Sequence, residues 1–411
     1  MYYRIFSIFK KYIKPVIKIA LWIVYFFSGL FPRCKKVYVF GSAHDSFIDN
    51  AKYLFIALSK KDTSSKLIWI TSNNEVISYL RGLGFSAYHK ISFPGAYYCL
   101  RAGTYFFNIY VTDINFWLSR NSRLINLWHG VPLKKIEHDI DSGPLLKNYC
   151  PKNSFDKLKA KVFYPHLSVE LFALAVPSKM LVDMFSSAFN ISKTKCIVAN
   201  YPRNEILLKS KKDIINFLGE LKEYASLEII KNINDYNKVY LYMPTWRDSG
   251  ADFISLSGLD FDVLDSLLHK RNEVFVLKMH PNTKICLDSM WRFKNIKVLN
   301  NSIDIYPILP FADTLITDYS SVYIDFLLLN KDIIFFCFDK DCYLSSQRSM
   351  YYDYDSVTPG SKAKNFQELL SFISSEKPVD YSVERKMVVE FFYGKENNCS
   401  LSDLITGEKF N

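Results

Sequence analysis

Short β-type runs alternate with helical stretches along almost the whole chain, and this alternation limits the fold more than any other feature. The first half has strand-like runs at 36–40, 67–71, 104–107, 124–127 and 172–176, and helices are expected near 50–59 and 75–83. In the second half, strands are expected at 238–243, 273–279, 296–298, 314–317 and 332–336, and helices at 260–270, 303–309 and 321–329. Such alternation predicts parallel sheets joined by crossover helices.

The two halves are separated by a charged, helical stretch at about 205–235 that contains no strand-like run. We therefore expect an α/β protein with two Rossmann-like domains, at 36–205 and 206–385, that face one cleft. Residues 1–35 should form a separate segment, and 386–411 a C-terminal tail or helix. A chain of 411 residues with 49% hydrophobic content is long enough for two full cores.

Positive charge is concentrated at the start of the chain. The formal net charge is +11, from 52 basic and 41 acidic residues, and eight of the basic residues but no acidic one lie within positions 1–36. The rest of the chain is therefore nearly balanced. This distribution argues against nucleic acid as a partner, because the excess charge is confined to an apolar segment.

The same basic segment is rich in aromatic and aliphatic residues, and it carries no charge from Ile19 to Pro32. We expect a helical anchor at the membrane surface, because basic and apolar residues together favour the interface of an anionic bilayer. A tilted spanning helix and a helix buried in the globular domain are the alternatives, since this run is shorter than the roughly 20 residues that span a bilayer. A cleaved signal peptide is not favoured, because the run ends in Phe31-Pro32-Arg33.

Neither metal nor disulfide chemistry is indicated. Eight cysteines are scattered without CxxC or Cys/His spacing, which favours a reducing, cytoplasmic location. Asp-x-Asp triplets at 139–141 and 353–355 have a spacing that can hold a divalent cation, but such triplets often arise by chance. We expect no metal and no cofactor.

Two histidines follow strand-like runs in loops bounded by glycine or proline. His129 follows the run 124–127 and precedes Gly130, whereas His280 follows the run 273–279 and precedes Pro281. Imidazole titrates near neutral pH, so either ring could move a proton. Because open α/β sheets bind ligands beyond the carboxyl ends of their strands, both loops are candidate functional sites.

Five short motifs occur in one order along the chain. They are WHGVPLK at 128–134, YPRN at 201–204, MPTWR at 243–247, KMHP at 278–281 and TDYSS at 317–321, followed by Asp325 and by further matches at 347–353 and 359–360. In these motifs the chain resembles the CDP-glycerol glycerophosphotransferases of teichoic-acid and capsule synthesis, over roughly residues 36–375. Val131 stands where the family pattern has Thr, and Ser349 where it has Gly.

The resemblance implies a fold of the GT-B type and the transfer of glycerol phosphate or ribitol phosphate. The donor would be CDP-glycerol or CDP-ribitol, the acceptor a hydroxyl of a lipid-linked saccharide or alditol phosphate, and the leaving group CMP. It also implies peripheral attachment to the cytoplasmic face of the bacterial cell membrane. Attack of a hydroxyl on the β-phosphorus needs a base and compensation of the charge on the phosphate oxygens.

The family motifs supply candidate residues for both tasks. His129 is expected to act as the base, and His280 to contact the donor pyrophosphate or protonate CMP, although the resemblance leaves the assignment of the two roles open. Ser320 and Ser321 lie where a strand turns into a helix, so they should hold donor phosphate. The other expected donor-binding residues are Trp128, Gly130, Val131, Pro132, Arg203, Thr245, Trp246, Arg247, Lys278, Met279, Asp325 and Arg348.

Two further functions stay open at this point. A GT-B glycosyltransferase would keep the fold and the anchor but transfer a sugar from a nucleotide sugar. A non-catalytic, membrane-attached binding protein would keep the cleft without turnover, and the presence of both His129 and His280 argues against it. The sequence does not separate glycerol from ribitol, a primase from a polymerase, or teichoic acid from capsule.

Overall fold

The computed structural model describes residues 14–143, 146–245, 256–279, 292–346, 349–395 and 399–407. Residues 1–13 of the basic segment, and the expected site residues Trp246, Arg247, His280 and Arg348, lie outside these ranges. The chain forms two compact units. Unit 1 contains residues 1–129, 136–203 and 397–411, and unit 2 contains 130–135 and 204–396. The chain therefore passes between the units at four places, one of which lies two residues before the expected boundary at 205/206.

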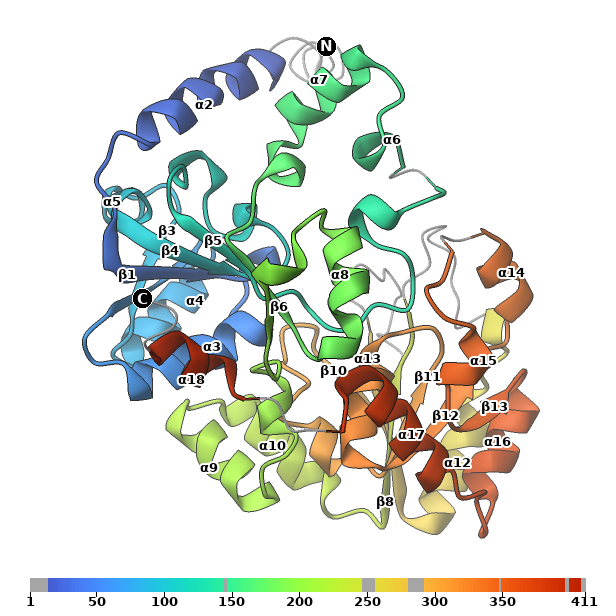
Figure 1. Ribbon diagram of the computed structural model, residues 1–411. Coiled ribbons are helices and arrows are strands. Elements are labelled where there is room, and N and C mark those ends of the chain that lie inside the picture. The colour runs from blue at the N-terminus through green and yellow to red at the C-terminus, as the bar shows by residue number, and fades with distance from the viewer. Residues whose placement is uncertain are drawn as a thin grey trace, which may run out of the picture. The chain divides into compact units, whose positions relative to one another are not determined.

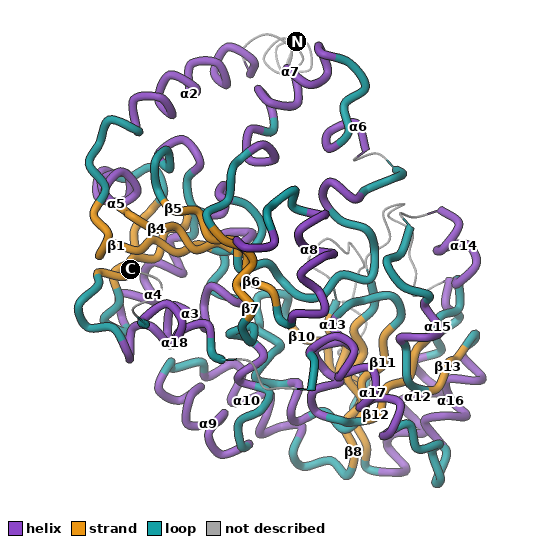
Figure 2. The backbone as a smooth tube through the Cα atoms, in the orientation of Figure 1, coloured by secondary structure: helices purple, strands orange, loops and turns teal. Residues whose placement is uncertain are grey.

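Unit 1 is built on a seven-stranded sheet in which every pair of neighbouring strands is parallel (Figures 1 and 2). Its strands are β1 (Cys34–Gly41), β2 (Lys66–Thr71), β3 (Ser86–His89), β4 (Ala102–Phe107), β5 (Arg123–Asn126), β6 (Ala173–Val176) and β7 (Cys196–Val198). Their order in the sheet is β3-β2-β1-β4-β5-β6-β7. The order reverses between β1 and β4, so the loops after these two strands part to opposite sides.

Helices cover both faces of this sheet, with α3 and α4 on one face and α5 on the other (Figure 1). The helices of unit 1 are α2 (Lys14–Ser28), α3 (Asp49–Lys61), α4 (Asn74–Gly82), α5 (Phe93–Arg101), α6 (Leu146–Tyr149), α7 (Ser154–Phe163), α8 (Val182–Ala188) and α18 (Leu401–Thr406). Capping side chains fix where two of these helices begin. The Asn73 side chain caps the N-terminus of α4, and the Ser92 side chain caps the N-terminus of α5. The core under α5 contains Ile68, Tyr105 and Phe107, all fully buried or nearly so.

The last described segment of the chain completes unit 1. The Lys61 ammonium on α3 forms an ion pair with Asp403 on α18 at 2.6 Å. The backbone N–H of Asn200 donates to the Cys399 carbonyl at 3.1 Å, and Asn200 forms a parallel bridge with Ser400. Residues from three separate stretches of the sequence are thus needed to build this unit.

Helix α2 packs on the rest of unit 1 through one of its faces. Trp22 and Tyr25 lie against the core, and the Tyr25 ring stacks on Phe116 with 4.7 Å between ring centroids. Within the described residues, we find no helix with both the length and the apolar content needed to cross a membrane.

Unit 2 contains a six-stranded sheet that is also parallel throughout. Its strands are β8 (Lys238–Met243), β9 (Glu273–Lys278), β10 (Ile296–Leu299), β11 (Thr314–Thr317), β12 (Asp332–Phe336) and β13 (Ser361–Ala363), in the order β10-β9-β8-β11-β12-β13. Its helices are α9 (Lys211–Glu220), α10 (Tyr224–Ile233), α12 (Phe261–Arg271), α13 (Val322–Phe326), α14 (Lys340–Ser346), α15 (Tyr354–Val357), α16 (Phe366–Ser374) and α17 (Ser382–Tyr393). Leucines of α12 and α16 pack with buried residues of β8, β9 and β12 in one core. This sheet reverses its order between β8 and β11.

The parallel α/β prediction is confirmed, and each expected strand is present within one or two residues. Three short strands, β3, β7 and β13, were not predicted. The helix expected at 303–309 is wrong: the segment forms turns that end in a 3₁₀ helix at Leu309–Phe311. Pro307 and Pro310 lack the N–H that an α-helix interior needs, which explains the difference. The expectation that two domains face one cleft stays a prediction.

Candidate active site

Each sheet holds a pair of polar side chains at its reversal point, where open α/β sheets bind ligands. In unit 1 the pair is Ser42, which follows β1, and Asn108, which follows β4; the Asn108 amide donates to the Ser42 hydroxyl at 2.8 Å. In unit 2 the pair is Thr245, which follows β8, and Asp318, which follows β11; the Thr245 hydroxyl donates to Asp318 Oδ1 at 2.6 Å.

His129 lies three residues beyond the end of β5, in a loop with an unusual backbone. Trp128 has φ +53°, a left-handed conformation that is uncommon for a bulky residue. Asn126 maintains this turn, because its side chain accepts from the Trp128 N–H at 2.8 Å and donates to the Ile109 carbonyl at 3.0 Å. The Trp128 ring lies 4.1 Å from the His129 ring between centroids, so the turn also orients the imidazole.

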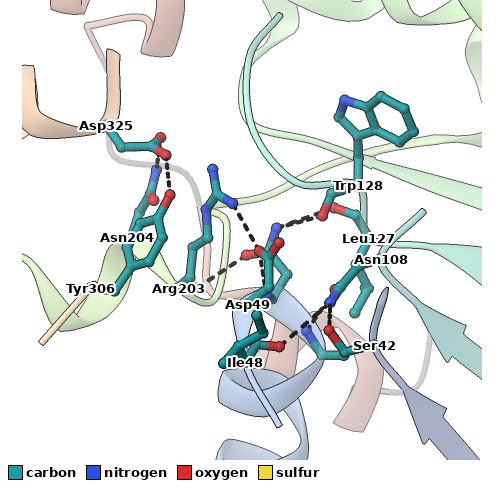
Figure 3. A network of polar contacts seen from close by, with 12 residues as sticks. Ser42, Ile48, Asp49, Asn108, Leu127, Trp128, Arg203, Asn204, Tyr306 and Asp325 are labelled. Carbon is teal, nitrogen blue, oxygen red and sulfur yellow. Dashed lines mark hydrogen bonds and ion pairs between the residues drawn. The ribbon is translucent and has the colours of Figure 1, made fainter. Parts of the chain in front are cut away.

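A buried asparagine of α3 joins this loop to the expected phosphate-binding arginine (Figure 3). The Asn50 amide donates to the Trp128 carbonyl at 2.9 Å, and its oxygen accepts from the Arg203 N–H at 3.1 Å. Arg203 forms an ion pair with Asp49 at 2.8 Å, and the two side chains are 6% and 19% exposed. Because both charges are largely removed from water, this pair fixes the guanidinium in place more than a surface pair would.

The environment of His129 keeps its ring neutral. Burial lowers the pKa of His129 to about 4, an effect that Asp49 opposes and Arg203 reinforces. Its Nδ1 atom is buried and has no hydrogen-bond partner among the described residues. A neutral imidazole with an unengaged ring nitrogen is in the protonation state that accepts a proton.

The motif that contains His129 is divided between the two units. His129 is the last residue of its segment of unit 1, and Gly130–Lys135 belong to unit 2. Gly130 has φ +122°, which only glycine adopts easily. The Lys135 N–H donates to the Ser349 carbonyl, and the Tyr351 N–H donates to the Leu133 carbonyl, both at 2.8 Å. Val131 and Pro132, which precede this short antiparallel pairing, are buried.

Asp318 organises the corresponding loop of unit 2. Its side chain is buried and accepts from the Thr245 N–H at 2.8 Å, the Thr245 hydroxyl at 2.6 Å and the Tyr319 N–H at 2.6 Å. The Tyr319 ring stacks on Tyr343 at 3.8 Å, and the Lys134 ammonium lies 4.2 Å from the Tyr343 ring centroid. The loop after β11 is therefore connected to the 130–135 segment by aromatic contacts within unit 2.

The remaining expected donor-binding residues within the described ranges differ in their exposure and in their hydrogen bonds. Ser320 and Ser321 are partly exposed where β11 leads into α13. Asp325 is buried, and it accepts from Asn204, Tyr306 and Tyr393, so it holds α13 to the start of unit 2.

Lys278 ends β9 and directs its charge towards backbone. Its ammonium donates to the Asn300 carbonyl at 2.7 Å, and burial lowers its pKa to about 8, partly offset by Asp304. Met279 beside it is 4% exposed. Lys278 is therefore a cation held at the carboxyl edge of the sheet, two positions before His280 in the sequence.

The sequence-based interpretation missed the residues that hold the His129 loop, namely Asn50, Asn108 and Asn126, and the partner of Arg203, Asp49. Asparagine and aspartate are common at helix starts and turns, so their sequence positions alone carry little signal. The Asp-x-Asp triplets serve local structure: Asp139 accepts from Ser187 at 2.6 Å, Asp353 caps α15, and Asp355 pairs with Lys340.

Comparison with known proteins agrees with the motif pattern. A sequence model of the family described as "CDP-Glycerol:Poly(glycerophosphate) glycerophosphotransferase" matches residues 23–402. The chain is 28% identical over 393 residues to a teichoic acid poly(glycerol phosphate) polymerase of Bacillus spizizenii, with 90% of this chain and 91% of that protein covered. It is also 28% identical over 408 residues to a teichoic acid glycerol-phosphate transferase of Staphylococcus aureus, with 96% of each covered.

A third relative has a different named alditol. The chain is 27% identical over 362 residues to a teichoic acid ribitol-phosphate primase of Bacillus spizizenii, with 86% of each chain covered. Among solved structures, the wall teichoic acid polymerase TagF has a TM-score of 0.72 at 24% identity, with 97% of each chain covered. This last similarity concerns the fold, which is α/β and GT-B-like.

Proposed function

Because the chain belongs to the CDP-glycerol:poly(glycerophosphate) glycerophosphotransferase family, we propose that it transfers glycerol phosphate from CDP-glycerol to a hydroxyl of a lipid-linked acceptor. It is an enzyme of the glycerophosphotransferase type, and its relatives are named for teichoic-acid synthesis, where we place its activity. The observation that carries the mechanism is the position of His129 in the loop after β5, which Asn126 and Asn50 hold through hydrogen bonds to Trp128.

The reaction needs one proton transfer at the nucleophile and one bond exchange at phosphorus. His129 takes the proton of the acceptor hydroxyl while the hydroxyl oxygen bonds to the β-phosphorus of CDP-glycerol. The bond from that phosphorus to the bridging oxygen breaks, and CMP leaves with the electron pair. The proton on His129 then passes to solvent. A neutral ring is the required starting state, and the low pKa of His129 provides it at pH 7.

The donor is assigned to unit 2. Phosphoryl transfer depends mainly on positioned charge around the phosphate oxygens. Thr245, Ser320, Ser321 and Lys278 lie at the carboxyl ends of β8, β11 and β9, and Asp318 fixes the first of these loops. We assign the same side to His280, Trp246, Arg247 and Arg348 from the family motifs, and to Arg203 a contact with phosphate.

Ribitol phosphate from CDP-ribitol is the second candidate group, because a ribitol-phosphate primase is among the relatives. Membership of the family removes the support for a nucleotide-sugar glycosyltransferase and for a non-catalytic binding protein. The assay below nevertheless includes a nucleotide sugar, since the fold alone does not exclude it.

The test is CMP release by detergent-solubilised protein with CDP-glycerol, CDP-ribitol or a UDP-sugar, each with a lipid-linked disaccharide acceptor. We expect release from a CDP-alditol by the wild type and a loss of at least about 1,000-fold in His129→Ala. His280→Ala should lose comparable activity. His269→Gln is the matched control, because His269 lies in the last turn of α12, before the amino end of β9, and contacts Asn295. Release from the UDP-sugar alone, or unchanged release by His129→Ala, would contradict the proposal.

We further propose peripheral attachment to the cytoplasmic face of the membrane through α2 and α7, which pack together in unit 1. The outer face of α2 exposes a stripe of apolar side chains, since Val16, Ile19, Ile23 and Phe27 are each 57–64% exposed, and Leu30 just after the helix is 77% exposed. On α7, Phe155 and Leu158 are 73% and 61% exposed, beside the exposed Lys157, Lys159 and Lys161. Exposed apolar side chains next to lysines fit the surface of an anionic bilayer.

Sedimentation with phosphatidylglycerol vesicles tests this attachment. A triple variant, Ile19→Asn, Ile23→Asn and Phe27→Asn, should lose most binding, because each change removes exposed apolar area. The matched control carries Val383→Asn, Met387→Asn and Phe391→Asn on α17, a second exposed apolar stripe with the same spacing but in unit 2. Equal binding by both triple variants would remove α2 from the contact.

A further inference from the structure

A cavity lies in unit 2 at the edge of the sheet opposite the donor loops. It is lined by the first residues of β8, β11, β12 and β13, which are Lys238, Thr314, Asp332 and Ser361. Its other walls come from α16, from the segment 375–381 and from Arg385 on α17. Because the strands are parallel, these first residues share the amino edge of the sheet, whereas Thr245 and Ser320 follow carboxyl ends. The cavity is therefore separate from the residues assigned to donor binding.

The cavity is large enough for a small organic molecule. Its volume is about 200 Å³, whereas a cavity that holds a single water has roughly 10–15 Å³. Part of its wall is apolar, with Phe372 on α16 and with Pro378 and Val379 in the segment that follows. Such a wall packs against the carbon atoms of a ligand, which a lone inorganic ion does not have.

Two lysines bring positive charge to the cavity. The Lys238 ammonium lies 5.0 Å from the centroid of the fully buried Tyr240 ring. Neither this ammonium nor that of Lys377 forms an ion pair or a hydrogen bond with another described residue. Arg385 and Asp332, in contrast, compensate each other, because their side chains pair at 3.1 Å. The three cations and one anion that line the cavity thus leave a net charge of +2.

Hydroxyl groups complete the polar part of the wall. Ser361, Ser371 and Ser375 line the cavity, and none of their hydroxyls bonds to another residue that the structure describes. The Thr314 hydroxyl is buried and also has no hydrogen-bond partner within the described ranges. Buried polar groups are paired in most proteins, so an isolated hydroxyl in a cavity wall indicates a place where a bound molecule completes the bonding.

This combination suits a small phosphate monoester. Such a group carries nearly two negative charges at pH 7, which match the two unpaired ammonium groups. A carboxylate would compensate only one of them. The phosphate oxygens accept hydrogen bonds from lysine and serine side chains, and the organic part of the ligand packs on the apolar wall.

We propose that this cavity binds a small organic phosphate, of the size of an alditol or sugar phosphate, through Lys238 and Lys377. The inference goes beyond the proposed function. Strand β8 has six residues, so roughly 20 Å of sheet separates the cavity from the donor loops, and the bound molecule is not a reactant. Strands β8 and β11 nevertheless begin at the cavity and lead to Thr245 and Asp318, so the ligand contacts the strands that carry these loops.

Calorimetry on the full-length, detergent-solubilised protein, without donor or acceptor, tests this assignment. The probes are glycerol 3-phosphate and ribose 5-phosphate, and the reference ligands are inorganic phosphate and glycerol. At least one organic phosphate should bind at least about 10-fold more tightly than either reference, because only the organic phosphates use both the charges and the apolar wall. Failure of both to bind at millimolar concentration, or equal binding of inorganic phosphate, would overturn the proposal.

A pair of double variants tests the two lysines. Lys238→Gln with Lys377→Gln should weaken binding of the organic phosphate at least about 10-fold, since two charge-assisted contacts are lost. Lys212→Gln with Lys231→Gln is the matched control, because it removes the same charge from exposed positions on α9 and α10 of the same unit. It should bind like the wild type. Equal affinity of the two double variants would contradict the role of Lys238 and Lys377.

Ser371→Trp separates binding in the cavity from general attraction by positive charge. Ser371 is an exposed residue of α16 that lines the cavity, so an indole at this position should occupy the space while both lysines are kept. We expect affinity to fall at least about 10-fold and the thermal midpoint to stay within about 2 °C of the wild type. Saturating CDP-glycerol should leave the wild-type affinity within about 2-fold. Unchanged binding by Ser371→Trp, or competition by CDP-glycerol, would place the phosphate elsewhere and reject this site.

Discussion

The two sheets share one topology, a parallel sheet that reverses its strand order, yet they use the reversal point differently. In unit 1 the chain itself fills this position: a Cβ on Gly41 would lie 2.7 Å from the Asp113 carbonyl, and the nearby Ser42 and Asn108 are buried. In unit 2 the corresponding Thr245 is partly exposed, next to the partly exposed Ser320 and Ser321.

This difference indicates that a reversal point does not by itself bind a ligand. The unit 1 pair belongs to a polar network in which Asn108 accepts from the Ala51 N–H at 2.9 Å, one residue after Asn50. It serves to position the His129 loop. The unit 2 pair arranges groups that reach the surface, and we therefore assign donor binding to unit 2 and positioning to unit 1.

The largest expected effect is in unit 2. Asp318→Ala removes the acceptor for three hydrogen bonds at the reversal point and leaves the Thr245 and Tyr319 N–H groups without it. We expect CMP release to fall about 100-fold or more, mainly through a higher KM for CDP-glycerol. Asp341→Ala, an exposed position on α14, is the control. An unchanged KM for the donor would break the assignment of donor binding to this unit.

The next largest effect is expected in unit 1, and it should lower kcat rather than raise the KM for CDP-glycerol. Asn50→Ala removes the bonds to the Trp128 carbonyl and the Arg203 N–H. We expect kcat to fall about 30-fold with the KM for CDP-glycerol within about 2-fold, because His129 loses its orientation, whereas the Arg203 guanidinium keeps its ion pair with Asp49 and the donor loops of unit 2 are unchanged. Asn74→Ala, an exposed residue of α4, should behave like the wild type. A rise in the KM for CDP-glycerol as large as the fall in kcat would contradict the assignment of donor binding to unit 2 and of His129 positioning to unit 1.

A matched pair of smaller changes compares the two reversal points directly. Thr245→Val removes the hydroxyl that bonds Asp318, and should raise the KM for CDP-glycerol about 10-fold. Ser42→Ala removes the hydroxyl that bonds Asn108, which keeps its bond to the Ala51 N–H, and should change turnover less than about 2-fold. Steady-state kinetics on both variants measures the contrast. Equal effects would contradict it.

The smallest effect concerns acid stability. The folded pKa of His129 and His166 is about 4, below the ordinary value of 6.5, so protonation favours the unfolded chain. Stability from these residues is complete above pH 6.5 and is lost as the pH falls towards 4. Each should contribute roughly 1–3 kcal/mol. Both lie in unit 1.

Thermal unfolding at pH 7 and pH 4.5 measures this loss. His166→Gln should reduce the fall of the midpoint by a few degrees, since glutamine does not titrate. His269→Gln in unit 2, where the ring contacts Asn295, is the control. An identical fall in wild type and His166→Gln would remove His166 from the acid response.

The sequence predicted the interior strands and missed the edges for a physical reason. Strands such as β4 and β9 are buried along their whole length and contain apolar runs, Tyr105–Phe107 and Val274–Leu277. The unpredicted β3, β7 and β13 have three or four residues each and all three are sheet edges, so their conformation depends on the one neighbouring strand. Local pattern cannot report such pairing.

The residues of the candidate site also fall into two groups, those that the local sequence predicted and those that it did not. His129 was found because a titratable residue after an apolar run has a local signature. The residues that hold it, Asn50 and Asn126, act through hydrogen bonds to Trp128, and for Asn50 the partner is 78 positions away.

The three-part composition of unit 1 has a consequence for synthesis on the ribosome. Its first strands emerge early, but α18 and the Cys399 segment, which bond to α3 and to Asn200, are made only after the whole of unit 2. Unit 2, although second in the sequence, has all its residues available first. The nascent chain must therefore carry an unfinished first unit, with one side of α3 uncovered, through most of translation, a period in which exposed apolar surface invites aggregation or chaperone binding.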